Sequence, residues 1–100
     1  MKTESRTETK SRLIEMLRID LPVLRARVGL SQEAIADKIG ISRQTYNNIE
    51  TGKREMAWTT FLALVAFFQS NEQTLPMLKQ IDGIIDGVER ILHEQKEEVQ

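Results

Sequence analysis

The amino-acid sequence predicts an all-α protein, and three observations support this fold class. Apolar residues recur at three- and four-residue intervals along most of the chain, as they do on the buried face of an amphipathic helix. Serine and glycine residues stand where such helices would begin and end. No segment shows the alternation of apolar and polar residues that is typical of a half-buried β-strand. These observations predict a series of short helices separated by turns.

The N-terminal region divides into a polar arm and a helical part. Residues 1–10 carry no apolar side chain after the initial methionine, which predicts a flexible arm. Further along, Asp20 and Pro22 are typical of a helix start, because Asp caps a helix and Pro is tolerated in its first turn. We expect either two helices, over 11–19 and 20–28, or a single helix kinked at Pro22.

Two short helices and a strongly apolar one follow. Ser31 and Ser42 stand at the N-cap positions of the two short helices, and Gly40 lies in the turn between them. The next helix, over about 59–69, is apolar on most sides, which predicts that it is buried. Thr59 is the expected cap of this helix.

The last segment, 75–99, carries a heptad-like pattern. Apolar residues alternate at three- and four-residue spacing, with one polar position, along Leu78, Ile81, Ile85, Val88, Leu92, Gln95 and Val99. This seam either folds back on the domain as ordinary core or pairs with its copy in a second chain, and we favour pairing. Gly83 and Gly87 within it either allow close helix approach or mark a bend.

Composition restricts the class of protein. One hundred residues are typical of one domain. No apolar run is long enough to span a bilayer and the start lacks a signal peptide's apolar core, so we expect a cytoplasmic protein. With no cysteine and His93 as the single histidine, we expect no metal site, no cofactor and no catalytic triad.

Charge is distributed unevenly along the chain. Residues 23–70 carry six basic and four acidic side chains, whereas residues 71–100 carry three basic and seven acidic ones. A polyanion would be attracted to the middle of the chain, and the C-terminal segment should point away from it.

The stretch LRARVGLSQEAIADKIGISRQTYNNIETGKR has the layout of a helix-turn-helix: two short helices, a turn built on glycine, and a second helix rich in amides and hydroxyls. From about residue 24 to 68 the chain resembles the Cro/cI-repressor type (XRE-like) family, through the pieces LR…GLSQEAIA, IGISRQT and IETGKR. The resemblance implies a compact, lambda-repressor-like bundle of about five helices. Its second helix would brace on phosphate and its third would lie in the major groove. We accordingly expect a DNA-binding domain at 11–70, with its helix-turn-helix core at 31–51, and a C-terminal dimerisation helix at 71–100.

The helix over 42–51 carries side chains that suit base edges, because Arg reads guanine, Gln and Asn read adenine, and the Thr methyl meets the thymine methyl. The predicted base-reading residues are Arg43, Gln44, Thr45, Asn47 and Asn48. Helix starts and the loop after Gly52 supply the predicted phosphate contacts, which are Gln32, Ser42, Lys53 and Arg54. The resemblance also implies that Arg25 and Glu50 form a buried ion pair with a structural role.

Three features depart from the family pattern. Position 46 is Tyr where a smaller aliphatic residue is usual, and we expect it in the core with its hydroxyl reaching the surface. The proline and Ser/Thr cap that usually follow GKR are replaced by the residues EMAW. The overall pI, about 5.8, is acidic.

We interpret the chain as a sequence-specific DNA-binding transcriptional regulator, a repressor, acting as a homodimer on double-stranded DNA. The alternative is a protein-interaction module with the same fold, or an antitoxin-type regulator that binds both a protein partner and its own operator. An enzyme is disfavoured, because the sequence shows no paired acid–base or metal-binding set.

Overall fold

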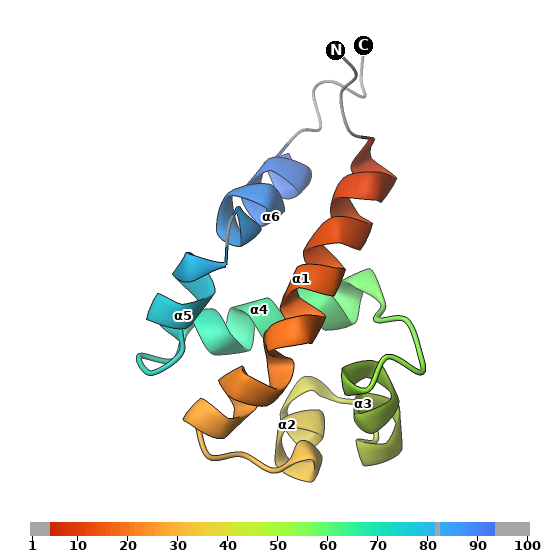
Figure 1. Cartoon of the computed structure of the whole chain (residues 1–100), viewed down its shortest axis with the longest axis vertical. Helices are drawn as coiled ribbons and strands as arrows, with labels where there is room; N and C mark the ends of the chain where they lie inside the picture. The colour runs from red at the N-terminus through yellow and green to blue at the C-terminus, as the bar shows by residue number, and fades with distance from the viewer. Residues whose placement is uncertain (1–4, 82, 94–100) are drawn as a thin grey trace.

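The computed structural model describes residues 5–81 and 83–93, which form six α-helices and no strand. In chain order these are α1 (Arg6–Arg27), α2 (Gln32–Ile39), α3 (Arg43–Glu50), α4 (Trp58–Gln69), α5 (Leu75–Gln80) and α6 (Ile84–His93). Figure 1 shows α1 running along the long axis, with α2 and α3 at its C-terminal end and α6 beside its N-terminal half. The predicted all-α fold class is confirmed.

The first helix begins earlier than predicted. Ser5 is its N-cap: the Ser5 hydroxyl accepts a hydrogen bond from the Glu8 N–H, and the Glu8 carboxylate accepts one from the Ser5 N–H, both at 3.0 Å. This reciprocal capping box stabilises the first turn of a helix even in a polar sequence. The prediction of a flexible arm over 1–10 is therefore wrong for residues 6–10, while residues 1–4 lie outside the described part.

Pro22 lies inside α1, so the predicted helix start near Asp20 is wrong. The same apolar stripe continues on both sides of the proline and is fully buried at Leu13, Leu17, Leu21 and Leu24. Burial of this stripe outweighs the loss of one backbone hydrogen bond at the proline. Of the two alternatives, residues 11–27 therefore belong to one helix rather than two.

The helices α2 and α3 form the expected helix-turn-helix. The Ser31 hydroxyl caps α2 by accepting a hydrogen bond from the Ala34 N–H at 3.0 Å. Gly40 ends the helix in the left-handed conformation, with φ +81°. The Ile41 N–H then donates to the Ala36 carbonyl at 3.0 Å, which closes the turn and brings α3 against α2.

The strongly apolar helix of the bundle is α4, which packs its apolar face into the core. Its N-cap is Ala57, which makes no side-chain cap, and Thr59 lies within the first turn, so the prediction of a Thr59 cap is wrong. The Trp58 ring instead holds this end of the helix: it stacks on Phe61 at 4.8 Å between centroids, and the Lys10 ammonium lies 5.1 Å from it. The fully or nearly buried side chains of α4 are Phe61, Leu64, Val65 and Phe68.

The C-terminal segment, predicted as one helix over 75–99, contains two helices within its described part. After Gln80 ends α5, Ile81 takes an extended conformation, with φ −73° and ψ 114°. Gly83 has φ +75°, in the left-handed region that residues with a Cβ atom rarely adopt. Gly83 therefore marks a bend, which is one of the two roles predicted for the glycines.

Gly87 has the other predicted role, because it allows α6 to lie close against α1. A Cβ atom at Gly87 would lie 2.8 Å from Cδ2 of Leu13 in α1, closer than van der Waals contact permits. Nearer the start of α1, the Arg6 guanidinium donates a hydrogen bond to the Ile91 carbonyl at 3.1 Å. The two helices are thus joined along most of α6.

The break between α5 and α6 divides the predicted seam. Leu78 and Val88 are buried in the molecule's own core, and Ile81 and Ile85 pack partly against it, whereas Leu92 is 45% exposed. The prediction of a single continuous seam is wrong. Leu78 and Val88 fold back into the core of the domain, which is the other alternative for this segment. The further seam positions Gln95 and Val99 lie outside the described residues.

Candidate nucleic-acid interface

The local sequence positions the start of α3. The Ser42 hydroxyl accepts a hydrogen bond from the Thr45 N–H at 3.0 Å and donates one to the Thr45 hydroxyl at 2.9 Å. Ser42 was predicted as a phosphate contact, and the structure uses its side chain as the N-cap of α3. The Thr45 hydroxyl is likewise bonded within the helix, and its methyl group remains the part of the side chain suited to a thymine methyl.

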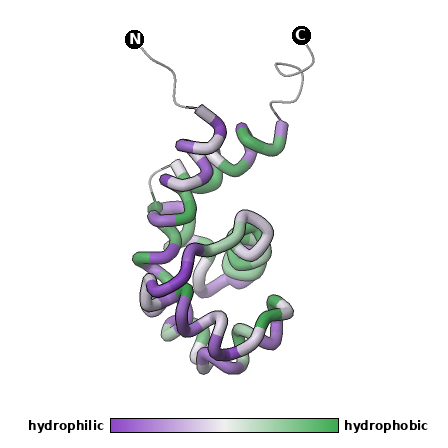
Figure 2. The backbone as a smooth tube through the Cα atoms, turned by 90° about the vertical axis from the view of Figure 1, so that its right-hand side faces the viewer, coloured by the Kyte–Doolittle hydropathy of each residue, from purple (hydrophilic) through white to green (hydrophobic). Residues whose placement is uncertain are grey.

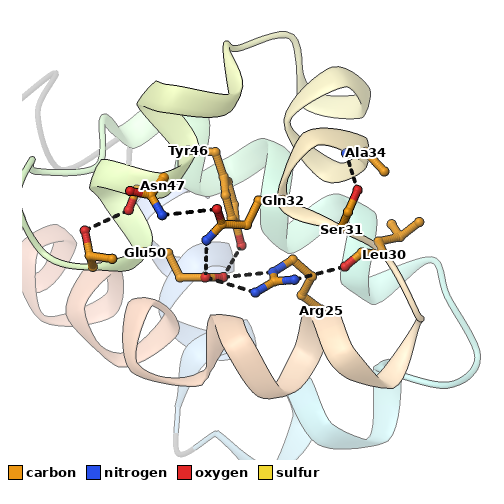
Figure 3. Close-up of polar contacts among 9 residues, drawn as sticks. Arg25, Leu30, Ser31, Gln32, Ala34, Tyr46, Asn47 and Glu50 are labelled. Carbon is orange, nitrogen blue, oxygen red and sulfur yellow. Dashed lines mark hydrogen bonds and ion pairs between the residues drawn. The ribbon is translucent and has the colours of Figure 1, made fainter.

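A carboxylate between α1 and α3 holds the two helices together. Arg25 donates to Glu50 through Nε and Nη2, each at 3.1 Å, and its Nη1 donates to the Leu30 carbonyl at 3.1 Å (Figure 3). The Glu50 side chain is only 6% exposed. The structure therefore places Arg25 and Glu50 together as a bidentate ion pair, the most directional form of this interaction, with a buried carboxylate and a partly exposed guanidinium.

The side chain of Tyr46 completes this contact from within α3. The Tyr46 hydroxyl donates to Oε2 of Glu50 at 2.8 Å, and Tyr46 is fully buried. The expectation that its hydroxyl reaches the surface is therefore wrong, because the carboxylate one turn along the helix offers it an acceptor. Burial, and then the hydrogen bond to Glu50, raises the pKa of Tyr46 above its usual range.

The α2 helix joins the same network through Gln32. The Gln32 amide donates to Oε1 of Glu50 at 2.8 Å, and its oxygen accepts a hydrogen bond from the Asn47 amide at 3.1 Å. Figure 3 shows Arg25 from α1, Gln32 from α2 and Glu50 from α3 converging. Gln32, predicted as a phosphate contact, and Asn47, predicted to read a base, are thus bonded to each other. This interaction fixes the orientation of α3 relative to α2.

The Glu50 carboxylate and the Arg25 guanidinium both stay charged at neutral pH. Burial alone would raise the pKa of the Glu50 carboxyl, but hydrogen bonds from Arg25, Gln32 and Tyr46 outweigh burial and hold that pKa below its ordinary value. The hydrogen bond between Arg25 and Glu50 raises the pKa of Arg25. The ion pair is therefore present throughout the physiological range.

The outer side of α3 carries the remaining predicted base readers. Arg43 and Gln44 are exposed, whereas Asn48 is half-buried. The Gln44 side-chain amide donates a hydrogen bond to the side-chain oxygen of Asn48, one turn along the helix, at 3.2 Å. In Figure 2 the hydrophilic α3 and the loop after it lie on the side that faces the viewer. This surface offers amide, guanidinium and methyl groups, the set that recognises base edges in a major groove.

The loop after α3 turns sharply and exposes two cations. Gly52 has φ +82°, and the N–H groups of Lys53 and Arg54 both donate to the Asn48 backbone carbonyl, at 2.8 and 3.1 Å. The side chains of Lys53 and Arg54 are exposed beside the C-terminal end of α3. The structure therefore brings the predicted phosphate contacts of the loop next to the predicted base readers.

Sequence reasoning missed three contacts of the network around Glu50, which are the hydrogen bonds from Tyr46 and Gln32 to Glu50 and the one between Gln32 and Asn47. The hydrogen bond from Tyr46 to Glu50 has a local signal, because residues four apart lie on one face of a helix. The pairing of Gln32 with Asn47 has none, because it depends on how α2 crosses α3. Within the described residues, no cluster of three His, Cys, Asp or Glu side chains is placed to hold a metal ion, and no helix is long and apolar enough to cross a membrane.

Comparison with known proteins agrees with this geometry. Residues 23–75, more than half of the chain, match the model of the helix-turn-helix family of the Cro/cI, XRE-like type. No curated protein and no solved structure matches the chain.

Proposed function

Because the chain belongs to the Cro/cI-type helix-turn-helix family of DNA-binding regulators, we propose that it is a sequence-specific transcriptional repressor that reads the major groove with α3. The observation that carries this proposal is the exposed polar face of α3 beside two exposed cations. Arg43 and Gln44 would contact bases, with Thr45, Asn47 and Asn48 beside them. Lys53 and Arg54 would contact phosphate.

The buried network supports this proposal by making α3 rigid. Base readout requires the recognition helix to keep one orientation, because hydrogen bonds weaken steeply when their geometry is poor. Glu50 fastens α3 to α1 and α2 through charge-assisted hydrogen bonds. We assign Gln32 and Asn47 a shared role, in which Gln32 braces on phosphate while it positions Asn47.

We further propose that the protein binds DNA as a homodimer. Helix-turn-helix readers of this size occupy two half-sites about one helical turn apart, roughly 34 Å. The partly exposed side chains of the C-terminal segment, Ile85 and Leu92, offer an apolar surface for a second copy. A bound dimer would repress by occupying its operator, without a cofactor.

Selection from a pool of random DNA duplexes, at low salt with purified protein, tests this function. We expect an enriched palindrome with half-sites about ten base pairs apart. Absence of enrichment over bulk DNA would overturn the proposal. It would favour the alternative, a protein-interaction module or an antitoxin-type regulator with the same fold.

A further inference from the structure

The turn after α3 contacts α1 at a residue that lies ahead of the segment matching the family model. A Cβ atom placed on Gly52 would lie 3.5 Å from Nη1 of Arg18. The family match begins at residue 23, so Arg18 belongs to the N-terminal extension of α1. The extension therefore brings a guanidinium next to the loop that carries Lys53 and Arg54.

One edge of the Arg18 guanidinium is already bonded. Its Nε donates to Oε1 of Glu15 at 3.0 Å, and its Nη2 pairs with the other carboxylate oxygen. Among the described residues, Nη1 has no hydrogen-bond acceptor, and it is the atom that lies toward Gly52. The Arg18 side chain is 27% exposed. Glu15 thus orients the group while the nitrogen nearest the loop keeps its donors available.

Open space adjoins the Arg18 side chain. A cleft of about 390 Å³ lies between α1 and the loop, and its walls include Glu15 and Arg18 from α1 and Gly52, Arg54 and Glu55 from the loop. Two arginines on opposite walls suit a single phosphate, because each guanidinium offers several fixed donors. The two glutamates balance this charge, so the cleft attracts an anion only weakly.

We propose that Arg18 is an additional phosphate contact of the DNA-binding surface, and that Glu15 limits its strength. This inference rests on the proposed function. Because Arg18 and Arg54 line the same cleft, a phosphate that Arg54 contacts there would also be open to Nη1 of Arg18. The Glu15 carboxylate holds the guanidinium in place, but its negative charge lowers the attraction for the same phosphate.

Salt-dependent titration of a labelled duplex separates these roles. Arg18→Gln should weaken binding several-fold for any sequence, and it should lower the slope of log K against log salt by about 0.9, the value for one lost phosphate contact. Glu15→Gln should tighten binding several-fold, because the amide still accepts a hydrogen bond from Arg18 but carries no charge. Lys79→Gln and Glu72→Gln make the same charge changes near α5, which lies across the molecule from α3 (Figure 1), and should alter affinity far less.

The results distinguish this inference from the proposed function. If the wild type binds duplex and Arg18→Gln matches Lys79→Gln in affinity and salt slope, Arg18 makes no phosphate contact. If Glu15→Gln weakens binding, the role of Glu15 is contradicted, whatever Arg18 does. If the wild type binds no duplex at all, the proposed function and this inference are both overturned. Unfolding curves recorded by circular dichroism verify that each variant is folded.

Discussion

Glu50 accepts hydrogen bonds from Arg25, Gln32 and Tyr46, which come from three different helices. A carboxylate with so little exposure is costly to bury, and the cost is offset only when its partners saturate the oxygens. Each partner therefore stabilises the fold mainly by keeping the buried Glu50 charge compensated. At the residue scale, the same four side chains that stabilise the bundle also set the orientation of α3.

Arg25→Ala should lower the free energy of unfolding by about 3–5 kcal/mol, because it leaves the buried Glu50 carboxylate without its cation. The matched control is Arg27→Ala, an exposed cation in the same helix, which should change stability by less than about 0.5 kcal/mol. Chemical denaturation at neutral pH measures both. Equal effects of the two substitutions would show that the pair contributes no more than a surface charge.

The pH dependence of stability follows from the same carboxylate. The pKa of Glu50 is lower in the folded state than in the unfolded chain, so folding favours the ionised form. Its contribution is present above the ordinary glutamate pKa, about 4.3, and is lost as pH falls through the lower folded value. Denaturation between about pH 7 and pH 3 should therefore show a decline that Glu50→Gln makes shallower. An unchanged profile in this variant would contradict the assignment.

At the scale of the helices, capping residues predicted where helices begin better than composition did. The starts of α2 and α3 were predicted from Ser31 and Ser42, because each serine directly precedes an amphipathic run. The first turns of α1 were missed because residues 6–10 are polar, although Ser5 and Glu8 have capping-box spacing. A heptad pattern is continuous across Gly83, so it gave no sign of the turn there.

The candidate site could be predicted as a set of residues but not as a set of contacts. The residue types on α3 indicate which side chains suit bases, since that follows from chemistry and helical periodicity. That Gln32 bonds Asn47, and that Arg18 lies against Gly52, depends on the angles at which helices cross. Those angles are set by core packing over the whole bundle.

The close contact between α1 and α6 predicts whether Gly87→Ala lowers or raises the free energy of unfolding. Gly87→Ala should lower the free energy of unfolding by about 1–3 kcal/mol, because the new methyl overpacks against Leu13. In a Leu13→Ala background the same substitution should be stabilising, since the space is open and alanine is favoured over glycine in a helix by about 1 kcal/mol. Thermal unfolding of the four proteins tests this. Stabilisation by Gly87→Ala in the wild type would contradict the close approach of α6.

At the scale of the whole molecule, α3 and α6 lie toward opposite ends of the long axis (Figure 1). Pairing through α6 would leave both recognition helices free for DNA. The bundle buries apolar residues from α1 through α6 in a single core, so the C-terminal helices contribute to the fold as well as to any pairing. The two roles are separable, because core and exposed side chains of this segment are different residues.

Leu92→Asp should convert a dimer to a monomer without unfolding it, because Leu92 is exposed and the charge would be buried on pairing. Val23→Asp, at a comparably exposed apolar position in α1, is the matched control and should leave the dimer intact. Light scattering gives the mass of each protein. A monomeric wild type, or a dimeric Leu92→Asp variant, would contradict pairing through α6.

Duplex selection with the Gln44→Ala variant, compared with the wild type, tests base reading by α3 most directly. Gln44 is exposed and bonded only to the adjacent Asn48 within the described residues, so its removal should leave the fold intact. We predict that the palindrome persists but loses its preference at one base pair in each half-site, with a cost of about 1–3 kcal/mol at the original sequence. An identical motif for both proteins would contradict a reading role for Gln44 on α3.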